Sequence, residues 1–130
     1  MVEVIELPGW NPRLTFAPAT RAGDFVFTAG LTATDDDGEL LHPGDIVEQT
    51  RVIFRKIERI LQQVGAGLDS IVETTEFFLP DPNYGRTAKV RRELFGTKFP
   101  AATGIPVTSL IRPGALIEIK AVAYVPRARA

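Results

Sequence analysis

The feature that most constrains this chain is an amphipathic segment near its middle, from Asp45 to Val64. From Val52 onward its apolar residues recur at spacings of three and four, which is the period of one helix face. Asp45 and Glu48 form something close to a capping box, and Gly65 suits the left-handed position after a helix end. We therefore expect a helix over 45–64 whose apolar face packs on a core.

Runs rich in β-forming residues lie on both sides of this helix. The predicted strands span residues 2–7, 14–19, 25–29, 71–79, 101–110 and 115–124. Turns are expected at 21–24 and 112–114, where glycine supplies the unusual backbone angle. A second helix is expected to open at Asp81, as its cap, with Pro82 in the first helical position, and to end at Gly96.

This order of elements predicts an α+β fold with two helices on one face of a sheet. The other face needs a cover, and in so small a chain the simplest cover is another copy of the same chain. The length of 130 residues, with 45% hydrophobic and 24% charged residues, fits a single globular domain over residues 1–130.

Composition excludes several kinds of chemistry. Cysteine is absent, which removes disulfides, thiolate nucleophiles and zinc–thiolate sites. The net charge of −1 gives no positive field for a nucleic-acid partner. No stretch approaches the ~20 apolar residues that span a membrane, so we expect no membrane partner and a cytoplasmic protein.

Motifs for metals and cofactors are also missing from the sequence. His42 is the only histidine, and one histidine cannot form a metal-binding cluster. The acidic run 35–37 lacks the later ligand spacing of a calcium loop, so we expect a hairpin tip. There is no glycine-rich phosphate loop after a strand and no serine nucleophile elbow. We expect no metal and no cofactor.

One carboxylate stands out, because Glu118 lies within the apolar strand Leu116 to Ala123. Alternation places Lys120 on the same face and Ile117 and Ile119 on the other. A carboxylate in such a strand is solvated, paired or directed into a pocket. The plainer interpretation is that Glu118 and Lys120 form a charged stripe on a half-exposed strand. The other is that Glu118 is a functional carboxylate.

Four stretches in register along the chain resemble the RidA/YjgF family, the reactive intermediate deaminases. They are GDFVFTAG at 23–30, LQQVGAGLDSIV at 61–72, FPA at 99–101 and LIEIKAVA at 116–123. The resemblance implies a chorismate-mutase-like fold and a homotrimer whose sheets form a central barrel, with ligand clefts between subunits. It also implies cofactor-free hydrolysis of enamines and imines such as 2-aminoacrylate.

The resemblance carries over one catalytic side chain and loses others. Glu118 matches the family's water-holding glutamate. Ala102 stands where the family has the arginine that grips the substrate carboxylate, Ala29 where it has a serine, and Phe16 where it has a tyrosine. The family's asparagine falls at or near Ala88.

The remaining site predictions concern backbone groups and a replacement cation. Backbone groups of Gly30, Thr103 and Gly104 are expected to line the cleft, since backbone donors survive side-chain changes. The candidates for a substitute cation are Arg92, Arg86, Lys89 and Arg112.

The functional prediction is a hydrolytic deaminase or related enzyme that acts on a small unsaturated or imine-bearing metabolite. The last strand is also similar to that of 2-aminomuconate deaminases, which makes aminomuconate-like compounds a possible substrate class. The alternative is a non-catalytic, ligand-binding regulatory trimer. RNA cleavage, suggested by older family names, is disfavoured by the net charge.

Overall fold

The computed structural model describes residues 1–128, and residues 129 and 130 of the expected domain lie outside the described residues. Two α-helices, two short 3-10 helices and a six-stranded sheet make up the described chain. In chain order the elements are β1 (Glu3–Ile5), β2 (Ala19–Ala22), β3 (Phe25–Thr28), α1 (Ile46–Gln62), η1 (Leu68–Ser70), β4 (Ile71–Phe78), η2 (Tyr84–Thr87), α2 (Ala88–Phe95), β5 (Ala101–Pro106) and β6 (Ile117–Tyr124).

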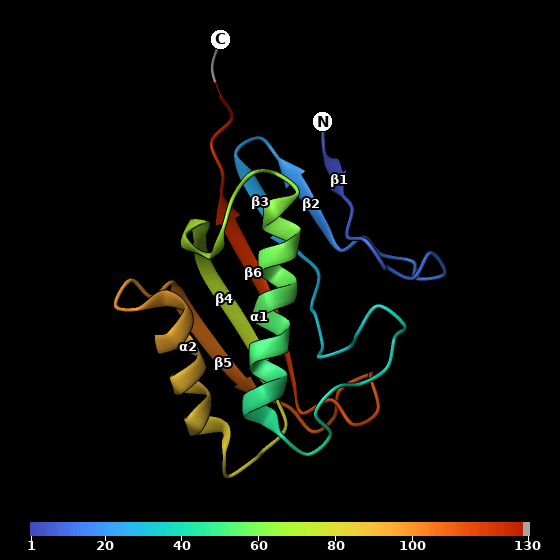
Figure 1. Ribbon diagram of the computed structural model, residues 1–130, viewed down its shortest axis with the longest axis vertical. Coiled ribbons are helices and arrows are strands. Elements are labelled where there is room, and N and C mark those ends of the chain that lie inside the picture. The colour runs from blue at the N-terminus through green and yellow to red at the C-terminus, as the bar shows by residue number, and fades with distance from the viewer. Residues whose placement is uncertain (129–130) are drawn as a thin grey trace.

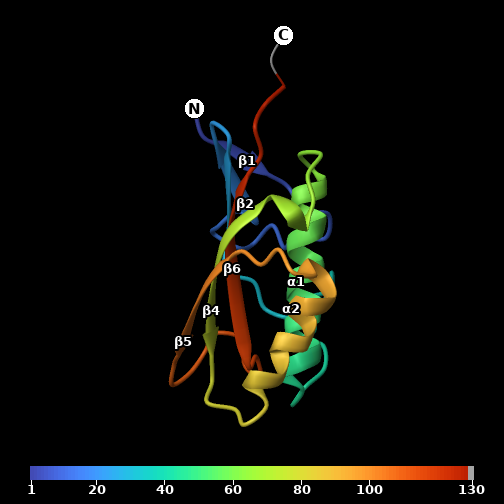
Figure 2. The same cartoon turned by 90° about the vertical axis from the view of Figure 1, so that its left-hand side faces the viewer.

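The strand order across the sheet is β1-β2-β3-β6-β4-β5 (Figure 1). Only β4 and β5 run parallel, because α2 returns the chain to the same end of the sheet, and the other pairs are antiparallel. Both helices lie against the same face (Figure 2). The predicted α+β architecture with two helices on one face is therefore confirmed.

The sequence signals that predicted α1 act as expected. Asp45 is the N-cap, and its Oδ1 accepts a hydrogen bond from the Glu48 N–H at 3.0 Å. The apolar residues Ile53, Ile57 and Ile60 are fully buried in the core. Gly65 follows the helix with a φ of +72°, the left-handed region that glycine tolerates.

Alternate residues of the central strand β6 point to opposite faces of the sheet. Its residues Ile117, Ile119, Ala121 and Ala123 are buried beneath the helices, as the alternation predicted. Its other residues face the side that no helix covers, which we call the open face. Pairing along the sheet puts further apolar side chains on the open face, namely Val4, Phe25, Phe27, Phe77, Ile105, Val122 and Tyr124.

The predicted strand at 14–19 is wrong. Asn11 starts a turn, since its side chain accepts from the Arg13 N–H and its carbonyl from the Leu14 N–H. Pro18 has no N–H for a ladder. The strand begins only at Ala19, and it includes Arg21 and Ala22, which were expected in the turn.

Other element boundaries also differ from the prediction: β1 spans Glu3–Ile5 and not 2–7, and α1 ends at Gln62 and not at Val64. The Asp81 side chain accepts from the Asn83 N–H in a turn, so helical structure begins at Tyr84 as a 3-10 turn and not at Pro82. Strand β5 stops at Pro106. Strand β6 starts two residues late, because the Ala115 N–H closes a turn and the Leu116 N–H donates to Gln49 Oε1.

A buried polar cluster anchors the second helix to the sheet. Glu76 of β4 is only 2% exposed, and it accepts two hydrogen bonds from Arg91 of α2, at 2.5 and 3.1 Å. The Tyr84 hydroxyl donates to the same carboxylate at 2.8 Å, and its ring stacks on Phe78 at 3.6 Å. Burial and the Glu76 carboxylate raise the pKa of Tyr84 to about 12.

Candidate functional site

Glu118 lies on the open face of β6, opposite Phe77 of β4. Its side chain is half-buried, and this burial raises the pKa of the carboxyl group. Within residues 1–128 the carboxylate accepts no hydrogen bond and has no cation within salt-bridge distance. Structural carboxylates that are half-buried are usually paired, so a partly desolvated carboxylate that stays free fits a reactive group.

Gly30 makes room for this carboxylate. The Leu31 and Ile119 backbones exchange hydrogen bonds of 2.9 and 3.0 Å, which holds Gly30 beside Glu118. A Cβ atom built on Gly30 would overlap Glu118 Oε2 and lie 3.0 Å from its Cδ. Gly30 therefore contacts Glu118 through the space that its missing side chain leaves, and the expected role of its backbone groups in a cleft stays a prediction.

Ala29 directly precedes Gly30 after β3, and Phe16 lies in the segment before β2. The Ala29 N–H donates to the Pro18 carbonyl at 2.8 Å, which ties the end of β3 to the segment that carries Phe16. Phe16 is 52% exposed, and its ring packs edge-on against Trp10. We call Phe16, Ala29, Gly30 and Glu118 the glutamate group.

Ala102, Thr103 and Gly104 lie elsewhere, on the exposed edge strand β5. Strand β4 separates them from β6, so about 10 Å of sheet lies between the two strands. Thr103 pairs with Thr75, which pairs with Lys120, and all three face the open side. We call Ala102, Thr103 and Gly104 the edge group, and one chain does not bring it to the glutamate group.

The glycine at position 104 has a packing explanation. A Cβ atom there would lie 2.8 Å from the Tyr84 hydroxyl oxygen, on the helix side of the sheet. The tyrosine that completes the Glu76 cluster therefore requires glycine in the strand below it. Nothing in the sequence links these two positions, because they meet only once η2 is folded over β5.

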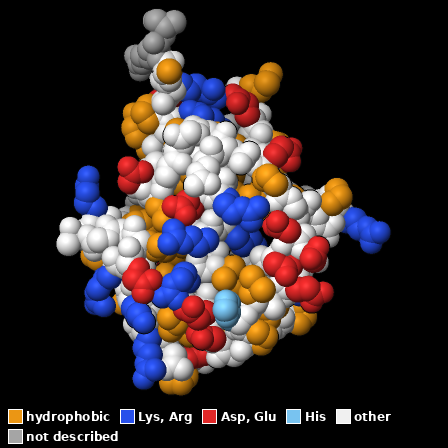
Figure 3. Space-filling view, in the orientation of Figure 1, with side chains coloured by type: hydrophobic (Ala, Val, Ile, Leu, Met, Phe, Trp, Pro, Cys, Tyr) orange, Lys and Arg blue, Asp and Glu red, His pale blue; other side chains and the backbone are white. Residues whose placement is uncertain are grey.

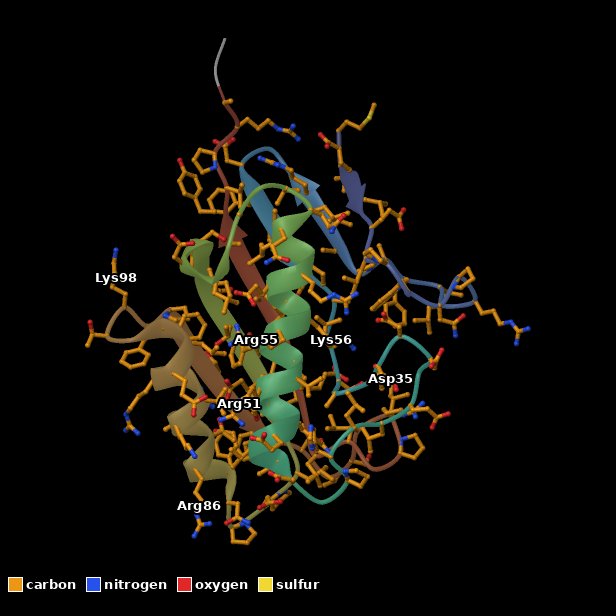
Figure 4. The ribbon with its side chains drawn as sticks, in the orientation of Figure 1. Asp35, Arg51, Arg55, Lys56, Arg86 and Lys98 are labelled. Carbon is orange, nitrogen blue, oxygen red and sulfur yellow. The ribbon has the colours of Figure 1, made fainter. Side chains whose placement is uncertain are left out.

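Three of the four candidate cations lie in the helix layer, and the fourth, Arg112, lies in the loop before β6. Arg86, Lys89 and Arg92 are exposed on η2 and α2, in the helix layer on the opposite side of the sheet. Arg86 points outward from the edge of the molecule in Figure 4. The Arg112 Nε atom is buried and lacks an acceptor among the described residues. Ala88, the expected asparagine position, begins α2.

Lys120 is the cation that shares the open face with Glu118. It lies two residues further along β6, and its side chain is exposed. It makes no salt bridge with any described carboxylate. In the sequence it is distinguished only as the same-face neighbour of Glu118. It also lines a small hollow of about 170 Å³ with Thr75, Glu73 and Phe27.

The described residues hold neither a cluster of metal ligands nor a helix that could span a membrane. In residues 1–128 no three or more histidine, aspartate or glutamate side chains gather as metal ligands would. Across the same residues, none of the helices has the length and apolar character needed to cross a membrane.

The chain is thus a small α+β protein whose candidate site, around the Glu118 carboxylate, lies on the sheet face that no helix covers. A family model described as Endoribonuclease L-PSP matches residues 10–125. The chain is 33% identical over 124 residues to the 3-aminoacrylate deaminase RutC of Acinetobacter baylyi, covering 95% of this chain and 98% of that protein. It is 32% identical over 109 residues to a RutC family protein of Pyrococcus abyssi, covering 84% of this chain and 85% of that one.

Solved structures agree with these sequence matches. The Rid-family protein YyfA of Yersinia pestis, itself described as of unknown function, superposes with a TM-score of 0.86 at 30% identity, over 96% of this chain and all of that one. A YjgF/YER057c/UK114 family member of Mycobacterium tuberculosis gives a TM-score of 0.72 at 36% identity, over 85% and 86%. The chain therefore belongs to the RidA/YjgF family, which the Endoribonuclease L-PSP model describes.

Proposed function

We propose that this chain is a cytoplasmic, cofactor-free hydrolytic deaminase that acts on a small imine or enamine, with Glu118 as the group that activates water. The observation that carries the proposal is the free, half-buried Glu118 carboxylate, whose place is kept open by Gly30. Similarity to a 3-aminoacrylate deaminase supports deamination as the reaction class.

The chemistry needs one carboxylate that takes and returns a proton. The Glu118 carboxylate accepts a proton as water oxygen attacks the imine carbon, and the C=N bond becomes a C–N single bond. The carboxylic acid then gives that proton to nitrogen. The product is a carbinolamine. The carboxylate next carries its hydroxyl proton to the same nitrogen, the C–N bond breaks, ammonia leaves and a carbonyl group remains. An enamine first takes a proton on carbon to become the imine.

The complete cleft, in this proposal, forms between neighbouring copies in a homotrimer. The glutamate group of one subunit would meet the edge group of the next, since one chain keeps the two apart. Phe16, Ala29 and Ala102 would make its walls apolar, favouring a larger or less acidic ligand than 2-aminoacrylate, such as an aminomuconate-like compound. Arg92, Arg86 and Lys89 would reach a ligand only from a neighbouring helix layer.

Lys120 is the residue we propose as partner of an anionic substrate group. Among residues 1–128 it forms no salt bridge. It faces the same side as Glu118 and lies one two-residue repeat away, about 7 Å along the strand. A lysine binds a carboxylate as a point charge, with less directional control than the two parallel bonds of an arginine. A lysine at this position would therefore hold the substrate carboxylate less firmly than the family's arginine would.

The test measures ammonia and carbonyl release from 2-aminoacrylate and 2-iminobutyrate generated enzymatically, and from 3-aminoacrylate and 2-aminomuconate. Glu118→Gln is expected to lower turnover by about 10²–10⁴-fold, the usual effect of losing a general base. Glu39→Gln is the matched control, since Glu39 is an exposed glutamate in the loop before α1. Full activity in Glu118→Gln would remove Glu118 from the mechanism.

The alternative, a ligand-binding regulatory trimer, is favoured by the alanines at positions 29 and 102. It predicts that the same compounds bind without turnover, which calorimetry beside the ammonia assay distinguishes. RNA cleavage is a separate outcome, and it would show as RNA binding that weakens steeply with salt.

A further inference from the structure

A second feature of the molecule is the separation of charge between two edges of its helix layer. Lysine and arginine side chains gather over α2 at one edge, and aspartate and glutamate side chains gather at the opposite edge, over the loop between β3 and α1 (Figure 3). Figure 4 places Arg86 and Lys98 at the first of these edges and Asp35 at the second. The chain has a net charge of only −1, so the distribution of its charges, and not their sum, distinguishes the two edges.

The positive edge is a row of cations along η2 and α2. Arg86, Lys89 and Arg92 follow one another at intervals of three residues, and we call them the basic ridge. All three are exposed, and side chains three apart on a helix are neighbours. Among residues 1–128 none of them lies within salt-bridge distance of a carboxylate. Glu93, the only carboxylate of α2, is bound by Arg51 of α1 at 2.9 Å, so the ridge keeps three cations without a carboxylate partner.

The negative edge is the exposed turn of the loop between β3 and α1. We call Asp35, Asp36 and Asp37 the acidic tip. The Asp35 side chain fixes the turn, because its Oδ1 accepts the N–H groups of Asp37 and Glu39, each at 2.9 Å. Asp36 binds Arg59 of α1 at 3.3 Å, which ties the tip to the helix layer. Asp37 is exposed, and no cation of residues 1–128 lies within salt-bridge distance of it.

Copies that associate through the open face bring these two edges together. In a closed ring whose members all turn the open face inward, each copy meets the next through opposite edges. The helices lie on the side of the sheet away from the open face (Figure 2), so the helix layers meet on the outside of such a ring. The acidic tip follows shortly after Gly30 of the glutamate group, and α2 leads directly into β5, which carries the edge group. A cleft shared by two copies therefore places the tip of one copy near the ridge of the next.

The charges decide which edges can meet. Two copies joined by the same edge would bring tip against tip or ridge against ridge, and like charges across an interface are costly. Two copies joined head to tail bring the tip against the ridge. Single exposed ion pairs contribute little affinity, so the effect of this contact lies in the order and the rate of assembly.

We propose that the acidic tip of one copy docks on the basic ridge of the next, and that this contact sets the head-to-tail order of the subunits. The partner of the α2 surface is thus a second copy of this chain. The proposal rests on the homotrimer of the proposed function and is independent of its deaminase chemistry.

The first experiment uses the absence of cysteine from the chain, because introduced thiols are then the only ones. Asp37→Cys and Lys89→Cys are combined in the full-length protein, and a bismaleimide bridges thiols that lie close together. Asp35 and Arg86 mark the two positions in Figure 4, at opposite edges of one chain, so a bridge must join two copies. We expect covalent dimers and trimers and nothing larger, because a closed ring ends at three. The matched controls are Asp37→Cys alone and Lys89→Cys alone, which should form no covalent dimers.

Each other outcome of this experiment overturns the proposal in a distinct way. Dimers from either single variant would show that like edges meet. Covalent species larger than trimers would place the contact between separate assemblies. No bridging while light scattering still gives trimers would exclude the tip and ridge as the contact and leave the homotrimer intact. No bridging by a monomeric protein would reject both this proposal and the homotrimer.

The second experiment tests the role of charge. Arg86→Glu/Lys89→Glu reverses the ridge and should slow trimer formation after dilution from urea by about tenfold at low salt, because attraction becomes repulsion. Adding Asp36→Lys/Asp37→Lys to the same chain exchanges both sets of charges and should restore most of the rate. In 1 M salt, where charges are screened beyond about 3 Å, the variants should assemble alike. Slowing that persists in 1 M salt, or no slowing at low salt, would overturn the role of charge.

Discussion

At the scale of single residues, the contact between Gly30 and Glu118 makes a sharp prediction. Gly30→Ala should lower turnover by about tenfold or more, because the new methyl group would occupy the space of the carboxylate and displace it. The φ of Gly30 is not in the left-handed region, so alanine adds no backbone strain. Gly85→Ala, where a Cβ meets nothing within 4 Å, is the control. Turnover equal to that of the control would show that the carboxylate position is not critical.

The raised pKa of Glu118 predicts how activity and stability depend on pH. The base must be ionised, so the acidic limb of the kcat/KM profile should lie above the ordinary glutamate range. A carboxyl whose pKa is raised by folding stabilises the fold at low pH, and this contribution disappears as pH rises through the folded pKa.

Glu118→Gln removes that contribution, so the difference in unfolding free energy between the two proteins should shift in favour of the variant as pH rises from about 4 to 7. Urea unfolding of both proteins across this range measures it. A constant difference would mean that burial does not perturb the carboxyl group.

Sequence reasoning at this scale found Glu118, because a carboxylate among isoleucines and alanines breaks a pattern. It could not predict the contacts of Lys56, because that lysine looks like any other charge on the exposed side of a helix. The Lys56 Nζ donates to the Thr32 carbonyl and to Thr34 Oγ1, two acceptors more than twenty positions earlier in the chain. A pattern of single residues holds no information about such a contact.

At the scale of elements, the Glu76–Arg91 pair is expected to fix α2 to β4. Arg91→Met should destabilise the protein by about 3–5 kcal/mol, because it leaves the Glu76 carboxylate buried without its cation. The double variant Glu76→Gln/Arg91→Met should cost less than the single one, since no charge is left buried. Urea unfolding measures both. Equal costs would assign the loss to packing of the arginine stem.

Elements with a strong local signal were predicted best. The cap at Asp45 and the spacing of buried isoleucines determine α1, and strict alternation determines β6. Predicted boundaries were wrong where a backbone N–H donates to a side chain and not within its own element. The Asn83 N–H donates to Asp81, and the Leu116 N–H donates to Gln49 of α1. The second of these contacts spans 67 positions, so it is invisible to any local reading of the sequence.

At the scale of the whole molecule, the open face predicts self-association. Phe25, Phe27 and Tyr124 are each more than two-fifths exposed there, on neighbouring strands. We expect light scattering to give three times the chain mass of 14.2 kDa. Phe27→Asp should yield monomers without turnover, because the charge would be buried in the interface. Ile111→Asp, at a loop residue that is 98% exposed, should remain trimeric. A fully active Phe27→Asp monomer would mean that one chain holds the complete site.

A division of the site between subunits has a consequence that self-association alone does not have. Glu118→Gln inactivates the glutamate group, and Ala102→Asp places a charge in the edge group two strands away. If each cleft takes one group from each of two neighbours, co-expression of the two inactive variants creates clefts in which both groups are unaltered. Random assembly gives about a quarter of such clefts, so about a quarter of normal turnover should return. If both groups served the same cleft within one chain, every cleft would carry one lesion, and the mixed trimers would stay as inactive as their parents.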